Sequence, residues 1–365
     1  MSRSGPVGVG VIGCGSISEA YLTTMARFPD LRVVALTDVD AERAAAQSDK
    51  HGVPRVSSTE ELLADDDIEL VVNLTIPAVH AEVSERAIAA GRHVWSEKPL
   101  AVDRKSGQQL LRSAEDAGVR LGAAPDMVLG TTVQSARRLI ESGRIGEPKT
   151  ALTLMQSAGP ESWHPNPEFL FAKGAGPLFD IGPYYIATLV QILGAFDRVQ
   201  AVGRISFPHR TIGTGPRAGT EFSVEVPTHI GFLGEFETGA MCTSVFSFES
   251  SVPRQTFEVN GTEGAIELAV NSYTADVRVR SSGDEWETIE STGTVHGFGL
   301  GVLDMARSVR AGTAHRATGE HAYHVLDTMI AVEDATRTGT TQTIASTVTP
   351  APVADPAWDP ESRTL

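Results

Sequence analysis

The sequence predicts an α/β domain built on a doubly wound parallel sheet, followed by an α+β domain with a mostly antiparallel sheet. Up to about residue 125, apolar runs alternate with helical segments, and repeated β-α units of this kind form parallel sheets. From about residue 146, strand-like runs follow one another through turns. A chain of 365 residues is also long enough for two cores. We therefore predict one domain over residues 1–125 and a second over residues 126–365.

The composition limits the classes of partner. The chain is 41% hydrophobic and carries a formal charge of −16, so we expect a globular protein that binds neither nucleic acid nor an anionic membrane. Its two cysteines, Cys14 and Cys242, offer neither a disulfide framework nor a thiol metal cluster. The first apolar run is expected to be the first strand of the fold and not a signal peptide, and no run reaches membrane-spanning length. We therefore expect a cytoplasmic protein.

The first strand is expected over residues 7–12, and it ends in a glycine-rich turn before a helical segment. The turn reads Gly13-Cys14-Gly15-Ser16-Ile17-Ser18. Gly13 permits a tight turn, and Gly15 allows the backbone to approach a pyrophosphate held by the N–H groups of the helix. Ser18 stands where a third glycine or an alanine is usual, so the motif depends on its context. A dinucleotide is the ligand that such a turn suits, with Gly13, Gly15, Ser16 and Ile17 as contacts.

A second strand, residues 32–36, leads to Asp38, which lies 25 residues after Gly13. In dinucleotide-binding folds, an acidic residue about 20 positions after the turn binds the ribose hydroxyls. Such a carboxylate favours NAD and repels the 2′-phosphate of NADP. The next arginine is Arg43, so an NADP-tolerant site stays open as an alternative. The other interpretation of the glycine turn and Asp38 is a surface turn followed by an aspartate that caps a helix.

The rest of the first domain continues the alternation. We expect helices near residues 40–50, after the capping box at residues 58–61, over residues 78–90 and after Asp103, and strands over residues 69–75, 92–96 and 119–123. Ligands of such sheets gather at the carboxyl ends of the strands. We therefore expect Thr75, Pro77, His80 and Glu97 to line the cofactor crevice, although His80 could equally pack within its helix.

Lys98 follows directly on a buried parallel strand, and Pro99 fixes the turn that carries it. This position would place the amine beside the nicotinamide ring of a bound dinucleotide, with little water around it. Partial desolvation is expected to lower the pKa of Lys98 toward that of a useful acid or base. The alternative is a solvated surface lysine.

A second group of reactive side chains lies at the start of a helix expected over residues 178–193. Asp180 and Tyr184 are four positions apart, so in one helix they would share a face. The Asp180 carboxylate could orient Lys98, and the Tyr184 phenol could hold or relay a proton. Asp180 could instead cap the helix while Tyr184 packs.

A proline-stiffened loop before that helix carries Trp163 and His164. Trp163 is suited to stacking on a sugar ring, and His164 could serve as a general base, or could simply be a hydrogen-bonded surface residue. Other histidines give no metal-like set: His321 and His324 are three apart without a third ligand, and His296 and His315 add none. We expect no metal site.

The second domain is predicted from short strands and three helices. The strands are expected over residues 149–156, 198–205, 230–237, 241–248, 257–259 and 264–268, and the helices over residues 178–193, 300–311 and 320–337.

In this order, the motifs resemble the glucose-fructose oxidoreductase, inositol dehydrogenase and rhizopine-catabolism family (Gfo/Idh/MocA) along nearly the whole chain. The matching positions are the glycine turn, Asp38, residues 75–80, Glu97-Lys98-Pro99 and residues 176–184. The resemblance implies an N-terminal Rossmann domain, a C-terminal open sheet that serves substrate binding and oligomerisation, and NAD(P)-dependent hydride transfer at a hydroxyl-bearing carbon. It also implies a sugar, inositol or other carbohydrate or cyclitol substrate and a homodimer or homotetramer.

The chain departs from the family at one position. Many members have a histidine four residues after the aspartate that matches Asp180, where this chain has Tyr184. The resemblance implies that Lys98 and Asp180 take part in proton transfer, but the base could be His164, or Lys98 assisted by Tyr184. Two further functions stay open: internal-redox lyase or glycosidase chemistry, and a non-catalytic dinucleotide-binding regulator. The presence of Lys98 and Asp180 favours an enzyme.

Overall fold

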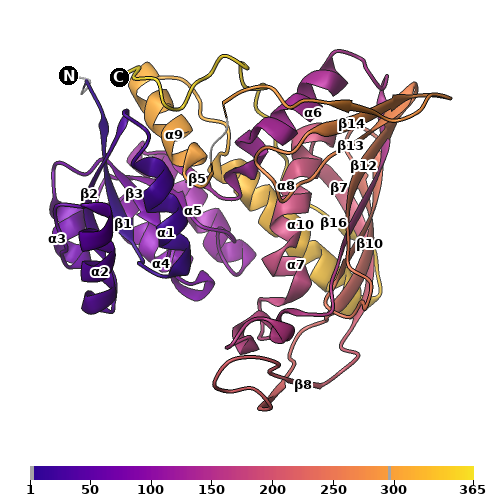
Figure 1. Cartoon of the computed structure of the whole chain (residues 1–365), viewed down its shortest axis with the longest axis horizontal. Coiled ribbons are helices and arrows are strands. Elements are labelled where there is room, and N and C mark those ends of the chain that lie inside the picture. Colours follow the sequence, from indigo (N-terminus) through magenta and orange to yellow (C-terminus); the bar gives the residue numbers. More distant parts are fainter. Residues whose placement is uncertain (1–3, 295–296) are drawn as a thin grey trace.

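The computed structural model describes residues 4–294 and 297–365, so His296 lies outside the described residues. The chain forms two lobes, each built on its own sheet, with helices of the second lobe between the two sheets (Figure 1). None of the helices in the described ranges has the length and apolar character needed to cross a membrane.

The first lobe is a five-stranded parallel sheet in the order β2-β1-β3-β4-β5. The strands are β1 (Val7–Ile12), β2 (Leu31–Thr37), β3 (Leu70–Asn73), β4 (His93–Ser96) and β5 (Leu121–Ala123). The helices are α1 (Ser16–Met25), α2 (Ala41–His51), α3 (Thr59–Ala64), α4 (His80–Ala89) and α5 (Arg104–Ala117). The predicted α/β domain is therefore confirmed.

Local signals explain why these helices begin and end where they do. Ser58 and Glu61 form the capping box expected from the sequence, because each side chain accepts the backbone N–H of the other. Asp40 and Asp103 cap α2 and α5. Gly118 ends α5 in the left-handed conformation that favours glycine.

The second lobe is a nine-stranded sheet in the order β15-β14-β13-β12-β6-β11-β10-β7-β16. The strands are β6 (Pro148–Gln156), β7 (Phe196–Arg204), β10 (His229–Phe236), β11 (Met241–Ser247), β12 (Arg254–Gly261), β13 (Gly264–Glu267), β14 (Val277–Ser281), β15 (Glu287–Ile289) and β16 (Gln342–Thr343). Neighbours β6 and β11 run parallel, and the other neighbouring strands run antiparallel. The mostly antiparallel sheet is thus confirmed. A separate hairpin joins β8 (His209–Thr211) to β9 (Glu221–Ser223).

Helices cover the face of this sheet that is turned toward the first lobe (Figure 1). They are α6 (Thr131–Glu141), α7 (Gly176–Asp180), α8 (Gly182–Leu193) and α10 (Gly319–Thr338). Fully buried aromatic rings of the sheet, including Phe196, Phe246 and Phe257, fill the core beneath them. The opposite face of the sheet leaves Val202, Leu233 and Met241 exposed.

The single helix expected over residues 178–193 is wrong. The structure divides it into α7 and α8, which meet at Ile181. Pro183 stands in the first turn of α8, where its missing N–H costs nothing at a helix start but could not continue a helix from α7. Asp180 therefore ends one helix, and Tyr184 lies in the first turn of the next.

The last part of the chain returns to the first lobe. Helix α9 (Leu300–Ala311) packs on β5, and a Cβ atom at Gly301 would lie only 1.9 Å from the Trp95 ring. Arg307 of α9 donates to the buried Asp30 carboxylate at 2.8 Å, and Asp30 also accepts the backbone N–H groups of Thr364 and Leu365. Segments of the predicted second domain thus form part of the packing of the first sheet. The boundary at residue 125 stays a prediction.

Candidate active site between the two lobes

The glycine turn has the geometry of an anion-binding helix start. Gly13 has a φ of +101°, and a Cβ there would lie 2.7 Å from the backbone of Leu74, so this position requires glycine. Gly15 is the N-cap of α1, where no side chain caps the helix, and a Cβ on Gly15 would meet no described protein atom within 4 Å. Packing within the described residues therefore does not demand glycine at position 15. The open space and the free N–H groups of the first turn fit a pyrophosphate.

Asp38 lies at the carboxyl end of β2, beside the glycine turn, as predicted. One carboxylate oxygen accepts the Cys14 N–H at 2.7 Å, and the other accepts the Asp40 N–H at 2.8 Å. Two backbone donors therefore fix the acid that is expected to bind the ribose. Burial raises the pKa of the Cys14 thiol to about 12, with a smaller contribution from Asp38, so the thiol stays protonated.

His80 connects the two segments that follow β3 and β4. Its ring is buried, and its nitrogens lie 2.8 Å from the carbonyl oxygens of Thr75 and Pro99. Asn73 supports the same corner, because its side-chain amide donates to the His80 carbonyl oxygen and its oxygen accepts the Thr75 hydroxyl at 2.6 Å. His80 thus fixes the positions of Thr75 and Pro99. Pro77 starts the short 3₁₀ turn (Pro77–Val79) that lies between Thr75 and His80. Contacts of these residues with a cofactor stay predictions.

Lys98 joins the two lobes. Its Nζ donates to the Asp180 carboxylate at 3.1 Å and to the Asp180 carbonyl at 2.8 Å. The structure therefore brings together two predicted residues that lie 82 positions apart. The expected fall in the pKa of Lys98 is wrong: burial lowers it, but the electrostatic interactions with Tyr184, Asp180 and Glu97 and the Asp180 hydrogen bond together raise it above the ordinary lysine value. Lys98 is a fixed cation at neutral pH.

Tyr184 completes the group. Its ring centroid lies 5.3 Å from the Lys98 Nζ, within cation–π range. Burial raises the pKa of Tyr184 to about 12, while the Lys98 charge lowers it. The phenol is therefore protonated at neutral pH and can donate a hydrogen bond. The three predicted residues Lys98, Asp180 and Tyr184 form one site although α7 and α8 are separate.

A buried acidic network lies behind this site, and the sequence analysis did not anticipate most of it. Glu97 accepts the Tyr21 hydroxyl at 2.8 Å and the Lys98 N–H at 3.0 Å, which ties helix α1 to the turn carrying Lys98. Asp126 accepts the Tyr273 hydroxyl at 2.7 Å and the Gly299 N–H at 2.8 Å. Burial raises the pKa of Asp126 to about 6 against the opposing effect of these hydrogen bonds.

The Trp163 and His164 loop stands apart from these contacts. The His164 ring packs edge-on against Trp163 and Phe169, and its Nδ1 accepts the Asn166 N–H at 3.0 Å. Trp163 is 68% exposed. The contacts of the described residues do not join His164 to Lys98, Asp180 or Tyr184. The proposed roles of Trp163 and His164 stay predictions.

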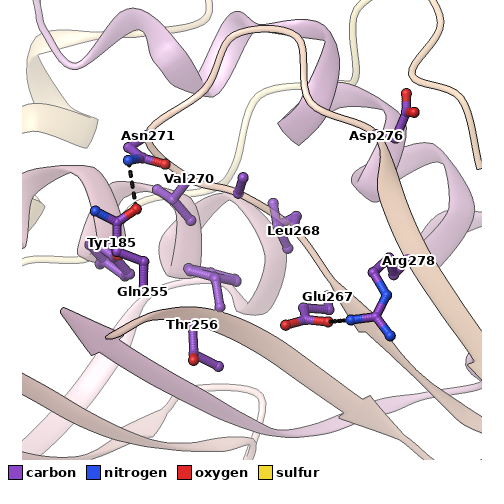
Figure 2. Close-up of a pocket in the computed structure, with 11 residues that line it drawn as sticks. Tyr185, Gln255, Thr256, Glu267, Leu268, Val270, Asn271, Asp276 and Arg278 are labelled. Carbon is purple, nitrogen blue, oxygen red and sulfur yellow. Dashed lines mark hydrogen bonds and ion pairs between the residues drawn. The ribbon is translucent and has the colours of Figure 1, made fainter. Parts of the chain in front are cut away.

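A hollow of about 230 Å³ lies elsewhere, between α8 and strands β12 to β14. Figure 2 shows Tyr185 among its lining residues, with polar side chains that pair with each other. Arg278 binds Glu267 at 2.6 Å, and Asn271 binds Gln255 at 2.7 Å. Tyr185 lies next to Tyr184 in sequence but lines this separate space.

Comparisons with known proteins agree with this geometry. The GFO/IDH/MocA model, an oxidoreductase family with an NAD-binding Rossmann fold, matches residues 7–124, and the GFO/IDH/MocA C-terminal domain model matches residues 133–267. The chain is 28% identical over 338 residues to 1,5-anhydro-D-fructose reductase of Ensifer adhaerens, covering 90% of this chain and 96% of that protein. It is 25% identical over 336 residues to D-xylose 1-dehydrogenase (NADP(+)) 2 of Haloferax volcanii, covering 90% and 97%.

Solved structures show the same fold. An NAD-binding oxidoreductase from Klebsiella pneumoniae superposes with a TM-score of 0.82 at 22% identity, covering 94% of this chain and all of that one. Levoglucosan dehydrogenase in complex with NADH and L-sorbose superposes with a TM-score of 0.81 at 22% identity, with the same coverage. The two family models together span both lobes and include the glycine turn, Lys98 and Asp180. The chain belongs to the GFO/IDH/MocA family of oxidoreductases with an NAD-binding Rossmann fold.

Proposed function

We propose that this protein is an NAD(P)-dependent oxidoreductase that transfers hydride between the nicotinamide and a hydroxyl-bearing carbon of a sugar or sugar derivative. The observation that carries the proposal is the Lys98–Asp180 contact at 3.1 Å, which places a fixed cation at the carboxyl edge of the cofactor sheet. The similarity to 1,5-anhydro-D-fructose reductase and D-xylose 1-dehydrogenase supports a sugar substrate. The bound nicotinamide would supply or accept the hydride.

The side chains of the site would manage the charge and the proton at the substrate oxygen. The Lys98 ammonium, held by Asp180, stabilises negative charge that develops on this oxygen. The Tyr184 ring lies beside Lys98, and its hydroxyl donates the proton when a ketone or aldehyde is reduced. In the oxidation direction the Tyr184 hydroxyl releases its own proton to solvent as it takes up the proton of the alcohol. This arrangement favours Lys98 with Tyr184 over His164 among the alternatives left open by the sequence.

Trp163 and His164 are proposed to bind the sugar rather than to react with it. The exposed Trp163 ring offers an apolar face of the kind on which sugar rings stack, and His164 is fixed beside it by its contacts with Phe169 and Asn166. The loop that carries them is followed by the 3₁₀ turn Glu168–Leu170 and then by α7, which ends at Asp180.

We also propose a homodimer formed through the uncovered face of the large sheet. Val202, Leu233 and Met241 are 80%, 47% and 47% exposed on β7, β10 and β11, where a hollow of about 710 Å³ lies. Light scattering of purified protein tests this. We expect a dimer or tetramer, dissociation by Val202→Asp, and no change with Val252→Asp, an exposed valine outside the sheet. A monomeric wild type would contradict the proposal.

The enzymatic proposal is tested by nicotinamide absorbance during incubation with NAD or NADP and a panel of inositols, aldoses, glycosides and anhydrosugars. Absorbance of the reduced cofactor that depends on one sugar identifies the substrate. Reverse reactions with NADH or NADPH and the corresponding ketoses cover the reduction direction. Cofactor binding without any turnover across both panels would contradict the proposal and favour a regulatory protein.

A further inference from the structure

The β8–β9 hairpin packs against the sugar loop, residues 157–171, which carries the two residues proposed to bind the sugar. In Figure 1 the hairpin lies below α7, at one end of the second lobe. The Gly213 N–H, from the segment that joins β8 to β9, donates to the Glu161 carbonyl at 2.8 Å. The Phe222 ring of β9 lies 5.2 Å from the Phe171 ring, measured between centroids. The hairpin therefore contacts the sugar loop near both of its ends.

Arg210 of β8 is the centre of these contacts. Its side chain is only 8% exposed, and its guanidinium forms an ion pair with the Glu161 carboxylate. The same group donates to the Ala158 carbonyl at 3.3 Å and to the Phe248 carbonyl at 3.0 Å. The guanidinium also lies 5.2 Å from the centre of the Phe171 ring, within cation–π range. One buried side chain thus joins two parts of the sugar loop to the segment that follows β11.

Stability alone does not explain this ion pair. The side chains of Arg210 and Glu161 are 8% and 15% exposed, and within the described ranges neither Arg210 Nε nor Glu161 Oε2 has a hydrogen-bond partner. A buried ion pair repays its desolvation only when such atoms are satisfied, and an apolar pair of similar volume is often as stable. The pair does impose a geometry, because a planar guanidinium holds its acceptors in fixed directions. Its effect is to restrict the conformation of the sugar loop.

A second arginine of the hairpin contacts the middle of the sugar loop. Arg217 donates to the Asn166 side chain at 3.3 Å and pairs with Glu168 at 2.5 Å. The Asn166 N–H donates to His164 Nδ1 at 3.0 Å, so the neutral His164 ring carries its proton on Nε2. Arg217 is 47% exposed, and an exposed ion pair adds little. The buried Arg210 is therefore the residue that positions the loop.

We infer that Arg210 is a positioning residue for sugar binding, and that the β8–β9 hairpin belongs to the substrate side of the enzyme. Arg210 holds both ends of the sugar loop, so that the exposed Trp163 ring and His164 present one arrangement to the substrate. Arg210 is too buried to touch the sugar itself. The inference rests on the proposed function, because it takes Trp163 and His164 as sugar-binding residues, and it goes beyond that function by assigning a role to the hairpin.

Steady-state kinetics of the full-length protein, with the sugar identified by the panel, test the inference. The double variant Arg210→Met with Glu161→Gln removes both charges, so neither is left buried and unpaired. We expect the KM for the sugar to rise roughly fivefold or more, with kcat and the Kd of the cofactor within about twofold, because Lys98, Tyr184 and the glycine turn are untouched. Arg210→Lys keeps the charge but not the planar fork, so its KM should lie between those of the double variant and the wild type.

Trp163→Ala in both backgrounds shows whether Arg210 acts through the loop. It should raise the KM about tenfold in the wild type but less than about threefold in the double variant, where the ring is no longer held in place. The matched control is Arg278→Met with Glu267→Gln, an ion pair at 2.6 Å whose guanidinium also lies over an aromatic ring, that of Trp286 at 4.9 Å. This control should leave the KM within about twofold.

Three results would overturn the inference while the enzyme still turns over a sugar. The first is an unchanged KM in the double variant, and the second is an equal effect of Trp163→Ala in both backgrounds. The third is a parallel loss of kcat, cofactor affinity and melting temperature in the double variant, which would make Arg210 a structural residue only. An absence of turnover with every sugar in both directions would instead contradict the proposed function.

Discussion

Replacing Tyr184 by phenylalanine removes one hydroxyl and retains the ring beside Lys98. With a pKa of about 12, the phenol is almost entirely protonated at pH 7.5, so it can act as a proton donor throughout the neutral range. A positioned general acid contributes about 100- to 10,000-fold to a rate. We therefore expect Tyr184→Phe to lower kcat for reduction at least about 100-fold. Cofactor affinity should change less than about twofold, because Lys98 and the glycine turn are untouched.

The assay is steady-state oxidation of NADH or NADPH, with cofactor affinity measured by fluorescence. Tyr185→Phe is a matched control, because Tyr185 lines the separate hollow of Figure 2, and loss of its hydroxyl should leave kcat within about twofold. A kcat of Tyr184→Phe within about threefold of the wild type would refute the reasoning. Loss of activity in His164→Asn would then assign the proton transfer to His164.

Three further predictions concern stability and substrate binding. Asp30→Asn should destabilise the fold by about 3–5 kcal/mol, because it removes the buried carboxylate that pairs with Arg307 and accepts the N–H groups of Thr364 and Leu365. Asp67→Asn in the exposed pair with Arg32 should cost less than about 1 kcal/mol, and equal melting temperatures of the two variants would contradict this. Burial opposes ionisation of Asp30, yet the hydrogen bonds from Thr364, Leu365 and Arg307 lower its pKa. The stabilisation is therefore present above the unfolded pKa of about 4. The difference in stability between Asp30→Asn and the wild type should shrink as pH falls below that value. Asp126 behaves oppositely: because its pKa is raised to about 6, the wild type loses stability as pH rises from about 4 to 6. In denaturant unfolding, the stability of Asp126→Asn relative to the wild type should therefore increase by roughly 2–3 kcal/mol over this pH range. A difference that does not depend on pH would rule this out. Trp163→Ala should raise the KM for the sugar about tenfold with kcat little changed, and an unchanged KM in steady-state kinetics would remove Trp163 from the binding site.

The first lobe could be predicted because its signals are local. Each strand is a short apolar run, and helices α2, α3 and α5 begin at caps that lie within a few residues, such as Ser58 with Glu61. The glycine turn and Lys98 could be placed at the carboxyl edge of the sheet for the same reason. Periodicity and caps are sufficient where a β-α unit repeats.

The parts that escaped prediction depend on distant partners. Helix α6 buries Thr132, Gln134 and Arg137, which look like surface residues in the sequence and are satisfied by Ala275, Ala354 and Gln191. Strands β14 and β15 and the β8–β9 hairpin gave no recognisable signal either. Polar residues that are buried with remote partners hide the amphipathic pattern on which the prediction relies.

The same limit applies to the site. The sequence placed Lys98 but could not give the sign of its pKa change, because Tyr184, Asp180 and Glu97 outweigh burial only together, and Asp180 is 82 positions away. The Asp126–Tyr273 pair spans 147 positions and carries no motif. The spacing of Asp180 and Tyr184 predicts a shared face only if both lie in one helix. In the structure they lie in two helices, and both contact Lys98.

The most direct test of the account is a single-turnover reaction with NADH or NADPH deuterated at the transferred position of C4 and the sugar identified by the panel, in wild type and Lys98→Met. We expect one deuterium on the product carbon for each cofactor oxidised, and loss of this transfer in Lys98→Met with cofactor binding retained. Product formed without net cofactor oxidation would contradict it in favour of internal-redox chemistry, and full transfer in Lys98→Met would remove Lys98 from the mechanism.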